Sequence, residues 1–264
     1  MRKKILIGIL LGTMLLFAVG CNKKEEKNTE KDSKKDVTQE VQQESVTPKE
    51  PSVKVMDVYT IGSYEQDADT ENGAEALEWL VLEVKDNKAL LISRYGLEAM
   101  PFNETEEAMT WEKCSLRTWL NSEFYETAFS KEEKEKIKKT TVLNNADANG
   151  GVDGGTDTED HVFLLSVEEA RKYFGEDGVE ENGRNYNLNR ATTPTEYAKT
   201  KPLTIISGDK EYAGCSPYWL RTPGVAAHIA AIVDYNGDIY AFGHGVSEPK
   251  NMVRPAMWVE ITEE

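Results

Sequence analysis

Two segments near the C-terminus, each pairing a tryptophan with an arginine, constrain the fold of this chain most. One contains Trp219 and Arg221, and the other contains Arg254 and Trp258. Between them, Asn236-Gly237 separates two apolar stretches, which is the strongest short-range signal for a β-hairpin. We therefore expect the two segments to form the central sheet of one compact domain.

The preceding sequence alternates hairpin and helix signals. Apolar runs at 79–84 and 88–93 flank Asp86-Asn87 and predict another hairpin. Apolar residues at helical spacing over 116–128 predict a helix. Capping boxes at Ser130–Glu133 and Ser166–Glu169 predict two further helix starts. Short helices among many short strands indicate the α+β class, with antiparallel strands and long loops.

Three weaker patterns complete this expectation. The loosely alternating stretch 53–61 predicts a first strand, and 161–165 predicts a buried strand. Thr193-Pro-Thr-Glu196 predicts a helix start with proline at the first helical position.

The N-terminus has the pattern of an export signal. Three basic residues precede an apolar run that ends at Gly20 and is shorter than the about 20 residues of a membrane-spanning helix. The sequence Phe17-Ala-Val-Gly-Cys21 resembles the lipobox of bacterial lipoproteins, which implies that Cys21 is lipidated and becomes the new N-terminus. Two acyl chains suffice for stable anchoring. We therefore expect an outward-facing protein anchored to the cell membrane; an uncleaved anchor and an ordinary cleaved signal are the alternatives.

Three regions follow from this reading: a signal peptide at 1–20, a lipidated, disordered, charged tether at 21–52, and a globular domain at 53–264. The tether has almost no aliphatic and no aromatic residue, so it cannot offset the entropy of ordering. The formal net charge of the chain is −16. Because the charges of the tether nearly balance, the globular domain is acidic, which excludes nucleic acid as an expected partner.

The stretch 144–160 is rich in Asn, Asp and Gly and is the candidate calcium loop. The candidate ligands are Asp147, Asn149, Asp153, Asp157 and Asp160. Closely spaced oxygen ligands on a Gly-rich loop suit calcium, but the loop has Asn and Thr where a calcium loop has its first Asp and last Glu. A solvated acidic loop without metal is the alternative. Calcium is the sole cofactor that the sequence suggests.

The remaining candidate residues have two interpretations each. Cys114 and Cys215 form either a disulfide, as exported proteins allow, or two free thiols. The four residues Trp219, Arg221, Arg254 and Trp258 either pack as cation–aromatic units or line a sugar or peptide site.

Several stretches together resemble one bacterial domain-of-unknown-function family of exported and surface proteins. They are Gly62-Ser-Tyr-Glu-Gln, Glu78-Trp-Leu-Val-Leu, Cys114-Ser-Leu-Arg-Thr-Trp-Leu-Asn121, Asp160-His-Val-Phe-Leu-Leu-Ser166, Trp219-Leu-Arg-Thr-Pro-Gly224 and Val253-Arg-Pro-Ala-Met257. The last two are also distantly similar to the C-type-lectin-like fold shared with formylglycine-generating enzymes. That similarity implies pairing of the first and last strands, but it gives no function by itself.

We therefore expect a membrane-anchored surface lipoprotein with a C-type-lectin-like domain that binds a ligand, either an envelope glycan or a protein. The alternative is an envelope enzyme, namely a hydrolase or an oxidase similar to formylglycine-generating enzymes. A third alternative is a purely structural surface module. The sequence identifies no catalytic residues.

Overall fold

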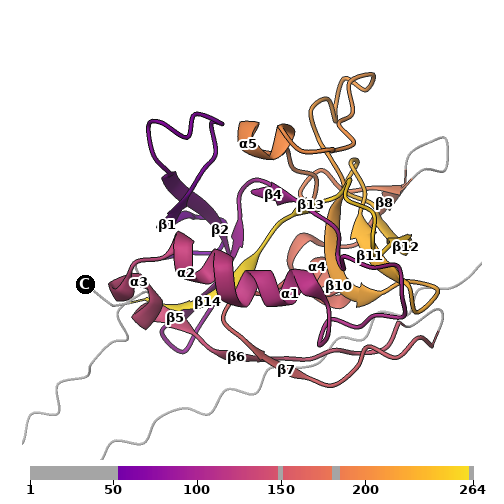
Figure 1. The fold of residues 1–264 in the computed structure, drawn as a ribbon, viewed down its shortest axis with the longest axis horizontal. Coiled ribbons are helices and arrows are strands. Elements are labelled where there is room, and N and C mark those ends of the chain that lie inside the picture. Colours follow the sequence, from indigo (N-terminus) through magenta and orange to yellow (C-terminus); the bar gives the residue numbers. More distant parts are fainter. Residues whose placement is uncertain (1–52, 148–150, 180–184, 262–264) are drawn as a thin grey trace, which may run out of the picture. The chain divides into compact units, whose positions relative to one another are not determined.

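The computed structural model describes residues 53–147, 151–179 and 185–261, and two five-stranded sheets together with the helices contribute its core (Figure 1). The described residues belong to one compact α+β domain. The expected signal peptide, Cys21 and the tether lie outside the described residues. Among the residues that are described, no helix combines the length and the apolar character needed to span a membrane.

The first sheet is antiparallel throughout and runs in the order β1, β2, β3, β14, β5. Its strands are β1 (Val58–Tyr64), β2 (Glu75–Lys85), β3 (Lys88–Ser93), β14 (Ala256–Glu260) and β5 (Ile137–Lys138). The hairpin predicted at Asp86-Asn87 is confirmed. Both residues have positive φ, 50° and 56°, as a type I′ turn requires.

The last strand does not pair with the first. β14 lies between β3 and β5, whereas β1 is an edge strand beside β2, so the expected pairing of the two terminal strands is wrong (Figure 1). The first strand also begins at Val58, five residues later than the sequence pattern predicted.

The second sheet runs in the order β12, β11, β10, β13, β4. Its strands are β12 (Ile239–Gly245), β11 (Ile229–Val233), β10 (Tyr218–Pro223), β13 (Met252–Val253) and β4 (Glu98–Ala99). The β11–β12 hairpin around Asn236-Gly237 is confirmed. Only the β10–β13 pair is parallel.

The two tryptophan–arginine segments therefore lie in different sheets, and the prediction of one central sheet is wrong. The second segment is interrupted at Arg254-Pro255, between β13 in one sheet and β14 in the other. Pro255 has no backbone N–H and cannot extend the hydrogen-bonded ladder. The chain crosses from one sheet to the other at this point.

The helices are short, as predicted. They are α1 (Ser115–Trp119), the π-helical turn η1 (Leu120–Phe124), α2 (Tyr125–Ala128), α3 (Lys131–Lys136), α4 (Val167–Phe174) and α5 (Glu196–Lys199). Both capping boxes are confirmed, at the starts of α3 and α4. The third helix start is misplaced, because Thr195, not Thr193, accepts the capping hydrogen bond.

Two further sheets have two strands each: β6 (Thr140–Val142) with β7 (Thr158–Asp160), and β8 (Gly178–Val179) with β9 (Asn185–Tyr186). The predicted strand at 161–165 is wrong. Its apolar residues are buried, but its only ladder contact in the described structure is an isolated bridge from Phe163 to Ala256. A continuous apolar run indicates burial without fixing the backbone conformation.

Candidate functional site

Trp219 and Arg221 on β10 are buried, so neither is available to a ligand. Trp219 has no exposed surface, and its indole N–H donates to the carbonyl of Met100. The Arg221 side chain is 3% exposed and makes a bidentate ion pair with Glu169, the residue that completes the capping box of α4. Its other donors bond the carbonyls of Leu143 and Leu164. Arg221 therefore fixes α4 onto the second sheet.

Arg254 joins the two sheets. It is 2% exposed. Its Nε donates to the carbonyl of Ser93 at 3.0 Å, and its Nη1 donates to the carbonyl of Arg190 at 3.0 Å and to the Tyr218 hydroxyl at 3.3 Å. The guanidinium also lies 5.2 Å from the centre of the Tyr218 ring. Burial thus removes three of the four predicted ligand-binding residues, Trp219, Arg221 and Arg254. The two guanidinium groups lie over Phe163, Phe174 and Tyr218, so their aromatic partners are not the predicted tryptophans.

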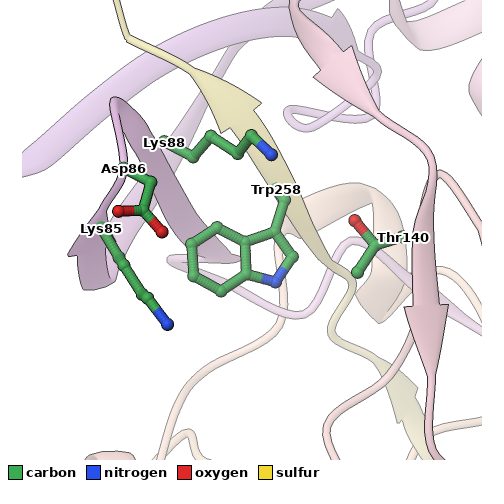
Figure 2. A pocket seen from close by; sticks show the side chains of 5 residues that line it. All are labelled: Lys85, Asp86, Lys88, Thr140 and Trp258. Carbon is green, nitrogen blue, oxygen red and sulfur yellow. The ribbon is translucent and has the colours of Figure 1, made fainter.

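Trp258 differs from those three because its indole lines an open pocket on the first sheet. The pocket has a volume of about 180 Å³ and is lined by Lys85, Asp86, Lys88, Thr140 and Trp258. This is below the about 300–1,000 Å³ of sites for drug-sized ligands, and it suits a single ring or a small group. Figure 2 shows the indole at the centre, with Asp86 and Lys85 to the left, Lys88 across the top and Thr140 to the right.

The local structure explains why these residues meet. Trp258 on β14 lies opposite Leu90 on β3, and Lys88 lies opposite Lys85 across the type I′ turn. Opposite residues in antiparallel strands point to the same face of the sheet. The backbone N–H of Ile261 donates to the carbonyl of Asn87 at 2.9 Å, which holds the turn beside the end of β14.

The two lysines of the pocket are exposed and, within the described part of the chain, form no ion pair. The sequence analysis missed Lys85, Asp86, Lys88 and Thr140 as site residues. The hairpin signal at Asp86-Asn87 already made the two lysines neighbours, so it could have identified them. Nothing local predicted Thr140, which β6 brings to the pocket.

The predicted calcium ligands do not converge on one point in the described structure. Asp153 accepts a hydrogen bond from the backbone N–H of Gly155, and Asp157 accepts one from Asn144. Asp160 is fully buried and pairs with Arg117, Trp111 and Thr158. These carboxylates stabilise the loop and the core.

Of the other two predicted ligands, Asp147 is buried, its backbone N–H donates to the carbonyl of Val152, and its carbonyl accepts from the N–H of Gly151. Asn149 lies outside the described residues.

One group of carboxylates that the sequence did not indicate lies within metal-ligand reach. Within the described part of the chain, oxygens of Glu65, Asp67 and Glu75 lie within 4.8 Å of one another. Burial and the nearby Glu75 raise the pKa of Glu65. The Glu75 carboxylate accepts from the backbone N–H of Gln66 at 2.7 Å, so it already orders the loop. We assign no metal site to this acidic loop.

Both candidate disulfide cysteines are free thiols, so the disulfide alternative does not describe this structure. Cys114 is buried at the start of α1, where its sulfur accepts from the N–H of Arg117. Burial raises the pKa of its thiol to about 12 and also raises that of Cys215. A protonated, buried thiol is a poor nucleophile, so Cys114 does not support the oxidase alternative.

Comparison with known proteins gives a family but no activity. The model of a family described as a domain of unknown function (DUF6273) matches residues 86–261, which is most of the chain. The matched region includes Lys88, Thr140 and Trp258 and begins immediately after Lys85. No curated protein and no solved structure matches the chain.

Proposed function

Because the chain belongs to the DUF6273 family, whose description assigns no activity, we propose a function from its own site: a membrane-anchored bacterial surface lipoprotein whose domain binds an envelope glycan. The observation that carries this proposal is the Trp258 pocket. Its indole is half-buried at the base of an open surface depression, with polar groups around it.

This arrangement suits a sugar ring. An indole presents a flat apolar face for the C–H groups of a pyranose, and the surrounding hydroxyl, carboxylate and ammonium groups bond its hydroxyls. Thr140 supplies a hydroxyl, Asp86 an acceptor, and the lysines donors. Clefts of this kind bind ligands through an apolar surface and a few polar groups that fix orientation.

The anchor is proposed from residues 1–21. A basic start, an apolar run and Cys21 form the lipoprotein signal, and the charged tether gives the domain reach from the membrane. The test is metabolic labelling with a fatty acid in a bacterial host. We expect label on the wild type and none on Cys21→Ser, which should leave the membrane fraction. Equal labelling of both proteins would refute the anchor.

The C-type-lectin-like architecture is part of the same proposal. Antiparallel sheets with short helices and long connections support it. The separation of β1 from β14 in the first sheet does not, because that fold pairs its terminal strands.

Binding is tested with the full-length protein in detergent and purified insoluble envelope polysaccharide. We expect saturable binding that Trp258→Ala largely removes. Tyr240→Ala is the matched control, because this tyrosine is 41% exposed and lies outside the pocket. Absence of saturable binding by the wild type, or equal binding by Trp258→Ala, would reject the proposal.

A further inference from the structure

The pocket of Trp258 is lined by two lysines, Lys85 and Lys88. Repulsion between their positive charges lowers the stability of the folded domain. Lys85 and Lys88 are direct cross-strand partners at the β2–β3 turn. Like charges directly opposite each other in a sheet are destabilising. Asp86 also lines the pocket and offsets one of the two charges, which leaves the pocket with a net charge of +1.

Neighbouring lysines on the same domain are neutralised. Lys138 pairs with Glu260 at 2.6 Å, and Lys172 pairs with Glu83 at 2.7 Å. These two glutamates also interact electrostatically with Lys88 and Lys85 respectively, but each is already held in an ion pair. Lys85 and Lys88 thus remain without ion-pair partners among the described residues, although the chain carries 47 acidic residues against 31 basic ones.

We infer that the pocket recognises a sugar that carries a negative charge, with Trp258 under the ring and Lys85 and Lys88 on either side of it as partners for acidic groups. This inference rests on the proposed glycan-binding function and names the class of glycan. The charged group can be a carboxylate, as in a uronic acid, or a phosphate ester on the sugar, because an ammonium donates to both.

The geometry in Figure 2 favours this assignment over a neutral sugar. Figure 2 shows the Lys88 ammonium above the indole and the Lys85 ammonium on the opposite side, beside the six-membered ring with Asp86, so a sugar ring on the indole lies between the two lysines. A neutral sugar would leave the mutual repulsion of the lysines in place. An acidic group on the sugar, bonded to either ammonium, offsets that repulsion and adds a hydrogen bond between charged groups.

The experiment compares three probes by titration calorimetry on the full-length protein in detergent. Trigalacturonic acid and its methyl ester have the same rings with and without charge, and glucose 6-phosphate tests phosphate as the acidic group. Hydrogen bonds between charged groups change affinity by about tenfold or more. We expect one or both charged probes to bind at least about tenfold more tightly than the ester.

Substitutions of the two lysines test whether they cause the preference for charged probes. Lys85→Gln and Lys88→Gln should each reduce affinity for the charged probe by a larger factor than affinity for the ester, and together they should abolish the preference for charge. Lys113→Gln, at an exposed lysine outside the pocket, is the control and should change nothing. Unchanged melting temperatures and circular dichroism show that each variant folds.

The outcomes separate this inference from the function on which it rests. If the ester binds as tightly as both charged probes and Trp258→Ala removes binding of all three, the charge inference fails and glycan binding stands. If the charged probes bind more tightly but the lysine variants have no effect, the assignment of Lys85 and Lys88 fails. If the insoluble polysaccharide and all three probes fail to bind, the proposed function fails as well.

Discussion

The buried ion pair between Arg221 and Glu169 gives the sharpest test of the structure. We predict that Arg221→Met, which keeps much of the side-chain volume, strongly destabilises the domain. The guanidinium is 3% exposed and the Glu169 carboxylate 31% exposed. Replacement leaves Glu169 without its cation and removes the donor that bonds the buried Leu164 carbonyl.

The magnitude follows from the burial of the two partners. Removing one partner of a buried ion pair costs about 3–5 kcal/mol. Because Glu169 is partly exposed and also accepts from the backbone N–H of Ser166, water and this bond compensate in part. We therefore expect the lower end, about 3 kcal/mol. With a urea m-value of about 2 kcal/mol/M, the midpoint of unfolding falls by about 1.5 M.

The assay is urea unfolding of the full-length protein, followed by tryptophan fluorescence. Arg94→Met is the matched control, because the Arg94–Glu78 pair is 42% and 43% exposed and such surface pairs contribute about 0–1 kcal/mol. A loss for Arg221→Met no larger than that of the control would refute the reasoning.

A double-mutant cycle with Glu169→Gln adds a second criterion. The glutamine side chain keeps an acceptor for the capping box but carries no charge. We expect the double variant to be more stable than the sum of the two single losses predicts, because one charge no longer remains buried alone. Strict additivity would show that the two side chains do not act as a pair.

Three further predictions concern other parts of the domain. Lys172 donates to Glu83 and holds the pKa of that carboxyl below its ordinary value. Lys172→Ala should raise the pKa of Glu83, and NMR titration measures the change. Because the carboxyl pKa is depressed, its contribution, below about 1 kcal/mol at this partly exposed site, is present at neutral pH and lost as the pH falls through the folded-state pKa. Cys114 should resist Ellman's reagent in the native protein, since burial raises the pKa of its thiol to about 12, and should react once urea unfolds the domain; reaction before unfolding would contradict its burial. Gly62→Ala should destabilise the domain by about 1–3 kcal/mol more than Gly73→Ala in urea unfolding. Both glycines have positive φ, but a Cβ would lie 2.6 Å from the Phe129 ring at Gly62 and meet nothing within 4 Å at Gly73, so equal losses would refute the close contact.

Local signals account for the parts of the fold that the sequence predicted. The capping boxes at Ser130 and Ser166 and the turns at Asp86-Asn87 and Asn236-Gly237 each depend on residues within a few positions of one another. Their hydrogen bonds and dihedral angles form within one turn, so the sequence is sufficient to locate them. The prediction of which strands share a sheet was wrong because strand pairing joins segments that are distant in the sequence. β14 inserts between β3 and β5, and Pro255 separates it from β13.

The candidate site shows the same division. By itself the sequence determined that tryptophan and arginine occur together twice and that two lysines flank a hairpin turn. It could not distinguish Trp219 from Trp258, because both lie in apolar strands beside an arginine. Only the tertiary structure decided which indole is exposed: Trp219 lies within the core, whereas Trp258 points to the open face of the first sheet, where β6 adds Thr140. The physical reason is that exposure depends on which layers cover a strand, and that packing is set by contacts far apart in the chain.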